Sequence, residues 1–196
     1  MVDHPPQVHA KATGVDLIAR EVLRRGDKIV VNIDFTEEVK QRLRSDGYTV
    51  IVCPVGTKHV VEALQRTGAR LGAERNGHYY FTRHVPDSDG IYAAALLSKL
   101  KPGSVLKFSQ EFRNVMLVEA VRASIDFSKL ASLAESSGAE VNTMDGVHAD
   151  FGGFILLMRA SNTEPIVRIN SEAKNKELAA KGMAVAKEIL DACKAI

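Results

Sequence analysis

The chain has 196 residues and a formal net charge of +2, with 45% hydrophobic, 26% charged and 6% aromatic residues. This composition predicts a globular protein with one large domain or two small ones. The basic residues are dispersed along the sequence, which argues against nucleic-acid binding, and no apolar run is long enough to cross a membrane.

The cysteines and histidines do not form a pattern typical of metal binding. Cys53 and Cys193 lie far apart, and no two histidines are at ligand spacing beside a carboxylate. We therefore expect a reduced, cytoplasmic protein without a metal site. Residues 1–12 are expected to be a tail, because the polar start of the chain lacks the apolar core of a signal peptide.

The first part of the chain alternates predicted helices and strands. Apolar residues at helical spacing, followed by Gly26, Gly47 and Gly68, predict three helices, and short apolar runs between them predict two strands. Thr36 is the expected N-cap of the second helix. The order strand–helix–strand indicates parallel pairing through a right-handed crossover. The predicted helices span residues 15–25, 37–46 and 57–67, and the predicted strands span residues 28–33 and 48–53.

A charged segment follows, predicted as a loop over residues 71–78 before an aromatic strand at residues 79–81. Glu74 can accept hydrogen bonds from two adjacent sugar hydroxyls, and Asn76 can both donate and accept. A solvated hairpin would contain similar residues, and His78 considered alone fits a half-buried packing residue. The residues by themselves leave both interpretations open.

The next apolar stretch, residues 89–100, predicts a helix with Asp87 or Ser88 as its cap. Proline, glycine and polar residues then concentrate up to Asn114, which predicts a domain boundary. We place the first domain at residues 13–110 and the second at residues 111–196.

The second domain is predicted to be an antiparallel sheet with helices on one face, an α+β arrangement. Turns at Asp145-Gly146 and Gly152-Gly153 separate short apolar runs, and the last helix repeats apolar residues at intervals of three and four. The predicted strands span residues 116–125, 140–142, 147–151, 154–158 and 166–170, and the predicted helices span residues 128–137 and 176–195.

Between the last two predicted strands lies the sequence Arg-Ala-Ser-Asn-Thr-Glu-Pro, residues 159–165. Small polar residues in a turn offer backbone and side-chain donors, and an adjacent guanidinium adds charge and bidentate hydrogen bonds. This combination suits a phosphate group. A hairpin rich in ordinary turn formers would have the same composition, so both interpretations remain open at this point.

Two motifs in this order resemble a known family. The segment at residues 159–165, followed by Arg168, resembles the phosphate-binding loop in the last domain of the phosphomannomutase/phosphoglucomutase enzymes, members of the α-D-phosphohexomutase superfamily. The sequences Pro-Val-Gly-Thr-Lys at residues 54–58 and Gly-Ala-Glu-Arg-Asn-Gly-His at residues 72–78 resemble the third domain of these enzymes. The resemblance covers residues 13–196.

The resemblance implies an α/β domain of three layers with a mixed sheet, followed by a four-stranded antiparallel sheet with helices on one face. It implies an isomerase of carbohydrate metabolism, an intramolecular phosphotransferase that interconverts hexose 1- and 6-phosphates. Asn76 stands where the family usually has serine, and Thr57 stands where the family often has a bulkier or basic residue. The implied phosphate-binding residues are Arg159, Ser161, Asn162 and Thr163, and the implied sugar-binding residues are Glu74, Asn76 and His78.

Two motifs of the family are absent from the sequence. One is the phosphoserine loop of Thr-x-Ser-His-Asn type, and the other is the Mg²⁺ loop of Asp-Gly-Asp-x-Asp-Arg type. We therefore expect no catalytic residue in this chain, and Mg²⁺ only with the N-terminal catalytic half, which belongs either to the same protein or to a separate partner chain. The expected ligand is a hexose phosphate, and the expected role is the substrate-recognition half of a mutase. A stand-alone, non-catalytic phosphosugar-binding or regulatory module is the alternative.

Overall fold

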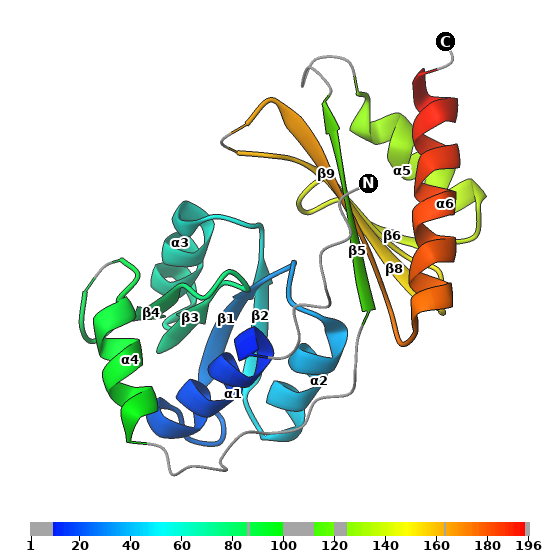
Figure 1. The fold of residues 1–196 in the computed structure, drawn as a ribbon. Coiled ribbons are helices and arrows are strands. Elements are labelled where there is room, and N and C mark those ends of the chain that lie inside the picture. Colours follow the sequence, from blue (N-terminus) through cyan, green and yellow to red (C-terminus); the bar gives the residue numbers. More distant parts are fainter. Residues whose placement is uncertain (1–9, 86, 100–111, 120–124, 163, 195–196) are drawn as a thin grey trace. The chain divides into compact units, whose positions relative to one another are not determined.

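The computed structural model describes residues 10–85, 87–99, 112–119, 125–162 and 164–194. The described residues divide into two compact units, one formed by those between 10 and 99 and the other by those between 112 and 194. Figure 1 shows helices and a sheet in each of them. The predicted boundary segment lies mostly outside the described residues.

The first unit contains a mixed sheet of four strands in the order β2-β1-β3-β4. Strand β1 pairs in parallel with both β2 and β3, and β4 pairs antiparallel with β3. The predicted parallel pairing across a crossover helix is confirmed. The elements in chain order are α1 (Ala10–Val22), β1 (Lys28–Asn32), α2 (Glu37–Ser45), β2 (Thr49–Cys53), α3 (Thr57–Thr67), β3 (Leu71–Ala73), β4 (Tyr79–Phe81) and α4 (Gly90–Ser98).

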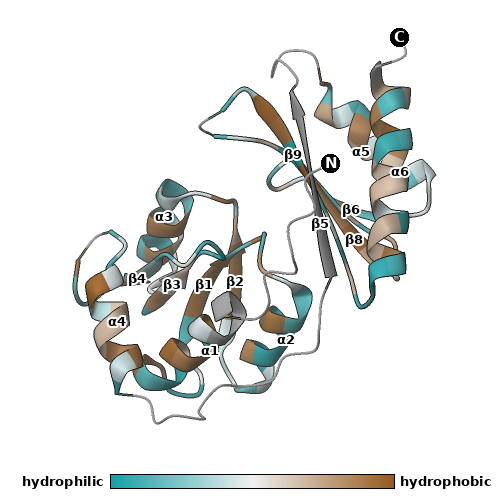
Figure 2. Cartoon of the chain, viewed as in Figure 1, coloured by the Kyte–Doolittle hydropathy of each residue, from teal (hydrophilic) through white to brown (hydrophobic). Residues whose placement is uncertain are grey.

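Helices cover both faces of this sheet, and a separate apolar core lies on each face. Ile29 and Val31 of β1 belong to the core under α1, α2 and α4, whereas Val30 between them belongs to the core under α3. Alternate residues of a strand point to opposite faces, so one strand contributes to both cores. The predicted three-layer α/β architecture is confirmed. The hydrophobic colouring of β1 in Figure 2 fits a strand that is buried on both faces, whereas β2 at the edge of the sheet is mostly half-buried.

The expectation that all of residues 71–78 form a loop is wrong at its beginning. Leu71–Ala73 is strand β3, which lies between β1 and β4. Gly72 is required there because a Cβ atom would lie 2.7 Å from Cγ1 of Val60 in α3. The glycine therefore marks a close approach of helix to strand, and it does not start the loop.

Several helix ends are set by caps. The Thr36 side chain accepts from the Val39 N–H, and Gly68 ends α3 in the left-handed conformation, both as predicted. The cap of α4 is Asp89 and not Asp87 or Ser88, because Asp89 Oδ1 accepts from the Tyr92 N–H at 2.8 Å. Helix α1 begins at Ala10, within the segment predicted as a tail.

The second unit contains an antiparallel sheet in the order β5-β9-β8-β7-β6, in which the short strand β6 forms one edge. The antiparallel class is confirmed, with β6 added to the four longer strands. Helices α5 and α6 pack over one face and share one apolar core with the sheet. The elements are β5 (Phe112–Glu119), α5 (Phe127–Ser136), β6 (Glu140–Asn142), β7 (Val147–Asp150), β8 (Phe154–Ala160), β9 (Ile166–Ala173) and α6 (Lys176–Lys194).

Four strands of this unit differ in length or position from the sequence prediction, and the smallest difference is in β7, which ends at Asp150 and not at residue 151. Strand β5 begins at Phe112 and not at residue 116, and residues 120–124 lie outside the described residues. Strand β8 continues to Ala160 and β9 continues to Ala173. Along β9, buried and half-buried residues alternate, so polar residues on the more open face do not end the strand.

Candidate functional site

The first candidate site lies where β3 ends and α3 begins. Residues 74–78 connect β3 to β4, and Gly56 precedes the first turn of α3 after β2. In open α/β sheets, ligands bind outside the carboxyl ends of the parallel strands, which is where both segments lie. The loop is closed by two backbone hydrogen bonds, Glu74 N to His78 O at 2.8 Å and Gly77 N to Glu74 O at 2.9 Å. Gly77 permits this turn with a φ of 102°.

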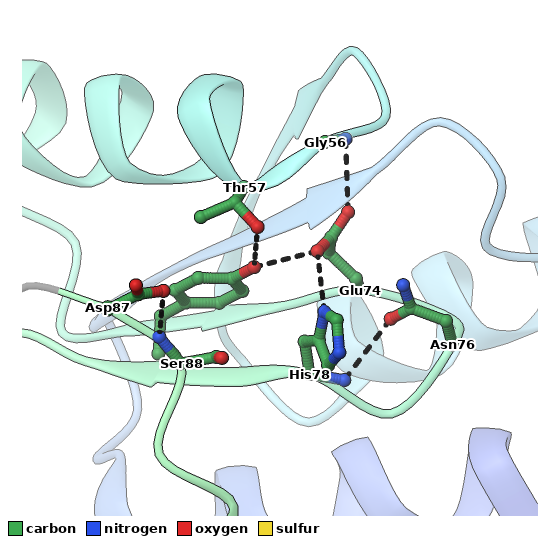
Figure 3. Close-up of polar contacts among 8 residues, drawn as sticks. Gly56, Thr57, Glu74, Asn76, His78, Asp87 and Ser88 are labelled. Carbon is green, nitrogen blue, oxygen red and sulfur yellow. Dashed lines mark hydrogen bonds and ion pairs between the residues drawn. The ribbon is translucent and has the colours of Figure 1, made fainter. Parts of the chain in front are cut away.

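Glu74 is the centre of this site (Figure 3). Oε1 accepts from the Gly56 N–H at 3.0 Å, and Oε2 accepts from the Tyr80 hydroxyl at 2.7 Å and lies 3.2 Å from His78 Nδ1. The side chain is only 2% exposed. A buried carboxylate is costly unless it is hydrogen-bonded, and these three donors together with the positive N-terminal end of α3 offset that cost.

His78 and Asn76 are the exposed members of the loop. When Nδ1 of His78 carries the proton and donates to Glu74, Nε2 is left as an acceptor. Asn76 Oδ1 accepts from the His78 N–H at 3.2 Å, so the amide nitrogen of Asn76 serves as a donor. The three residues predicted from the sequence therefore lie together, with a buried carboxylate beneath an imidazole and an amide.

Sequence reasoning missed Tyr80 and Thr57. Tyr80 is 1% exposed, and its hydroxyl lies 2.9 Å from Thr57 Oγ1 in addition to its bond with Glu74. Burial raises the pKa of Tyr80 well above its usual value; the Thr57 bond lowers this pKa, and the Glu74 bond raises it. The hydroxyl is therefore a donor at neutral pH. The sequence did contain a signal for Tyr80, which is a tyrosine between two other aromatic residues in a short strand. A buried tyrosine hydroxyl needs a hydrogen-bond partner, and the neighbouring polar loop could supply one.

The second candidate site is the hairpin that joins β8 to β9. Arg159 and Ala160 belong to β8, so the connecting segment is shorter than predicted and consists of residues 161–165. Ser161 N donates to Ile166 O at 2.9 Å, and Ser161 Oγ accepts from the Glu164 N–H at 3.3 Å. Two of the turn amides thus stabilise the hairpin itself. Asn162 is exposed, and Thr163 lies outside the described residues.

Arg159 is held beside this hairpin by the preceding turn. Its Nη1 donates to Ala160 O at 3.2 Å, and its Nε lies 4.0 Å from the Asp145 carboxylate, so that, among the described residues, other N–H donors of the guanidinium are left for a ligand. Gly146 has a φ of 74°, and a Cβ atom there would lie 2.3 Å from Met158 O. Only glycine lets the turn at residues 145–146 approach β8 this closely.

A second arginine of the hairpin was not among the predicted phosphate-binding residues. Arg168 of β9 is the direct cross-strand partner of Arg159. Its Nη2 pairs with Glu164, while its Nε is buried and has no hydrogen-bond partner among the described residues. Like charges opposite each other destabilise a strand pair unless an anion relieves them. The available signal was position, because Arg159 lies two residues before the connecting segment and Arg168 lies three residues after it.

Within the described part of the chain, no cluster of three or more histidine, cysteine or acidic residues could hold a metal ion. None of the described helices is long and apolar enough to cross a membrane. Neither Cys53 nor Cys193 forms a disulfide.

Two family models match consecutive parts of the chain. The model "Phosphoglucomutase/phosphomannomutase, alpha/beta/alpha domain III" matches residues 14–116. The model "Phosphoglucomutase/phosphomannomutase, C-terminal domain" matches residues 107–191.

Curated relatives include a phosphoglucomutase/phosphomannomutase of Thermococcus kodakarensis, which is 34% identical over 174 residues. This match covers 83% of the chain and 38% of the relative. A phosphoglucosamine mutase of Pelotomaculum thermopropionicum is 34% identical over 187 residues, which cover 88% of the chain and 41% of the relative. The chain spans about two fifths of the length of these curated relatives.

Solved structures of the same class share the fold. A phosphoglucomutase/phosphomannomutase family protein of Burkholderia thailandensis has a TM-score of 0.74 and 22% identity, with 94% of the chain and 42% of that structure covered. The N-acetylphosphoglucosamine mutase of Aspergillus fumigatus, solved with GlcNAc-6P and magnesium, has a TM-score of 0.57 and 17% identity, with 93% and 42% covered. With domain III and the C-terminal domain matched one after the other, the chain belongs to the phosphoglucomutase/phosphomannomutase family.

Proposed function

We propose that this chain is the substrate-recognition part of a phosphohexomutase and binds a hexose phosphate. The observation that carries the proposal is the pairing of Arg159 with Arg168 in direct register beside Ser161. Two guanidiniums at one end of a hairpin attract an anion, and planar guanidinium groups match phosphate oxygens with two parallel hydrogen bonds. The exposed Asn162 and the adjacent Thr163 would complete the phosphate contacts.

In this proposal, the loop at residues 74–78 recognises the sugar. Asn76 and His78 are exposed and offer an amide donor and an imidazole acceptor to hydroxyl groups. A carboxylate has about four acceptor positions. Three on Glu74 are occupied by protein donors, so Glu74 offers one further hydrogen bond to the sugar.

The chain's own residues bind and orient the substrate. Phosphoryl transfer also needs a nucleophile and a metal ion aligned with the phosphoryl group. The described residues do not supply a carboxylate set that fits Mg²⁺, so we assign no metal and no transfer step to them. The interconversion of hexose 1- and 6-phosphates then requires an N-terminal catalytic half, in the same protein or in a separate chain, that carries the phosphoserine and the Mg²⁺ loop.

Titration calorimetry with glucose 1-phosphate and mannose 1-phosphate tests the binding. A hydrogen bond to a charged group contributes about 1.5–3 kcal/mol, so Arg159→Ala should weaken binding about 10- to 100-fold. Arg66→Ala removes an exposed arginine at the end of α3 and is the charge-matched control. Equal affinities for wild type and Arg159→Ala would remove the phosphate assignment.

A second assay separates the two roles considered for the chain. Mixing it with a separately expressed N-terminal catalytic half and Mg²⁺ should produce mutase activity if the chain completes an enzyme. Hexose phosphate binding without activity at any mixing ratio would favour the alternative, a non-catalytic phosphosugar-binding or regulatory module.

A further inference from the structure

Strand β4 places Tyr80 differently from its two aromatic neighbours. Tyr79 and Phe81 belong to the core under α1, α2 and α4, whereas Tyr80 belongs to the core under α3. Because neighbouring residues of a strand point to opposite faces, Tyr80 alone of the three points to the α3 side. Its hydroxyl therefore reaches both the first residue of α3 and the carboxylate that follows β3.

The order of donors in this network follows from the single proton of the Tyr80 hydroxyl. Tyr80 donates that proton to Glu74 Oε2 at 2.7 Å, so its oxygen accepts from the Thr57 hydroxyl at 2.9 Å. Hydrogen bonds arranged in such a chain polarise and strengthen one another. Thr57, Tyr80 and Glu74 thus form a directed chain that ends on the carboxylate.

These hydrogen bonds determine which oxygen of the Glu74 carboxylate is left for a ligand. Oε2 accepts hydrogen bonds from the Tyr80 hydroxyl and from His78 Nδ1, and Oε1 accepts one from the Gly56 N–H. Among the described residues, one acceptor position remains, and it lies on Oε1. The Tyr80 hydroxyl also fixes the position of Oε2, and Oε2 in turn binds His78 Nδ1 and so orients the exposed imidazole.

We infer that Tyr80 is a positioning residue for sugar recognition. Its hydroxyl holds the Glu74 carboxylate so that one acceptor on Oε1 and the Nε2 atom of His78 are set for the sugar hydroxyls. The inference rests on the proposed function, because it assigns Tyr80 to the same sugar-recognition loop. A phenylalanine would fill the same space and would leave Oε2 with His78 alone, and Thr57 without its acceptor.

Calorimetry on Tyr80→Phe, with Tyr79→Phe as control, tests the effect on binding. Tyr79 is also buried, but its side chain lies in the opposite core, so the control loses a hydroxyl without touching Glu74. We expect Tyr80→Phe to weaken glucose 1-phosphate binding about 2- to 10-fold, the range for one lost hydrogen bond, and to leave binding of inorganic phosphate unchanged. Tyr79→Phe should leave both affinities unchanged.

A double-mutant cycle with Glu74→Ala separates positioning from general loosening of the fold. If Tyr80 acts through Glu74, then Tyr80→Phe should have no further effect on affinity in the Glu74→Ala background. Additive losses would overturn the inference, as would a Tyr80→Phe variant that loses inorganic phosphate to the same degree as the hexose phosphate.

The amide resonance of Gly56 provides a readout that needs no ligand. Its N–H donates to Glu74 Oε1, so its ¹H–¹⁵N shift should change in Tyr80→Phe and stay in place in Tyr79→Phe. Absence of hexose phosphate binding in the wild type would defeat the proposed function. An unmoved Gly56 resonance, or unchanged hexose phosphate affinity in Tyr80→Phe, would overturn the role of Tyr80 even if the wild type binds.

Discussion

Replacing Gly146 with alanine should destabilise the second unit more than any ordinary turn substitution. The φ of 74° costs an L-residue about 1–2 kcal/mol. The added Cβ would also lie 2.3 Å from Met158 O and 2.8 Å from Arg159 Cα, both of which are backbone atoms. Forced overpacking of this kind costs about 1–3 kcal/mol more, so the expected loss is about 2–5 kcal/mol.

Gly152→Ala provides the matched control for the steric part of this loss. Gly152 has a φ of 77°, and a Cβ there would meet no atom within 4 Å. It should therefore lose only the conformational part, about 1–2 kcal/mol. The difference between the two variants measures the contact between the turn and β8.

Urea unfolding followed by circular dichroism measures the free energies of unfolding. All four tyrosines, residues 48, 79, 80 and 92, lie in the first unit, so tyrosine fluorescence gives an internal reference. Gly146→Ala should also weaken hexose phosphate binding, because β8 is displaced at Arg159, whereas Gly152→Ala should not. Equal destabilisation by both alanines would refute the argument that the turn is in tight contact with β8.

Two further predictions concern charged side chains. Arg168→Ala should weaken hexose phosphate binding about 10-fold or more in calorimetry, as expected for the loss of a hydrogen bond to a charged group. An affinity equal to that of the control Arg66→Ala would contradict the role of the cross-strand arginine pair. Asp89→Ala should lower the melting temperature at pH 7, and Asp87→Ala should not, because only Asp89 accepts the capping hydrogen bond from the Tyr92 N–H. This hydrogen bond, followed by His84, lowers the pKa of Asp89, although partial burial opposes the shift. A carboxyl with a depressed folded-state pKa stabilises the fold above its ordinary pKa of about 4, so the difference between the two variants should shrink as the pH falls below that value, and a difference that persists in acid would argue against the cap.

The sequence was a good guide where one periodicity or one turn residue decides the structure. Helix α3 spans Thr57–Thr67 as predicted, because an amphipathic pattern ends at a glycine that adopts the left-handed conformation. The pairing of β1 with β2 followed from the helix between them. Glu74, Asn76 and His78 lie together in one loop, as their closeness in the sequence predicts, and their sugar-binding role stays a prediction that rests on the family resemblance.

The missed features depend on contacts between segments far apart in the chain. Gly72 was assigned to a loop, because its closeness to Val60 in α3 cannot be read from neighbouring residues. The end of β8 was placed too early because the strand ladder continues through Arg159 to Ala160 at the hairpin, and the end of β9 because the ladder continues through polar residues to Ala173 at its other end. Tyr80 was missed because its role depends on the face of the sheet to which a short strand turns it.

The Glu74 side chain links its own loop to the segment before α3, because it accepts a hydrogen bond from Gly56, 18 residues earlier in the sequence. The tip of the loop does not pack into either apolar core. Arg75 is half-buried, Asn76 is exposed, and neither belongs to an apolar cluster. The base of the loop is therefore fixed by Glu74 and Tyr80, while its tip is open to substitution at little cost in stability. Under the proposed function, single replacements at position 76 would change the groups offered to the sugar without disturbing the base of the loop.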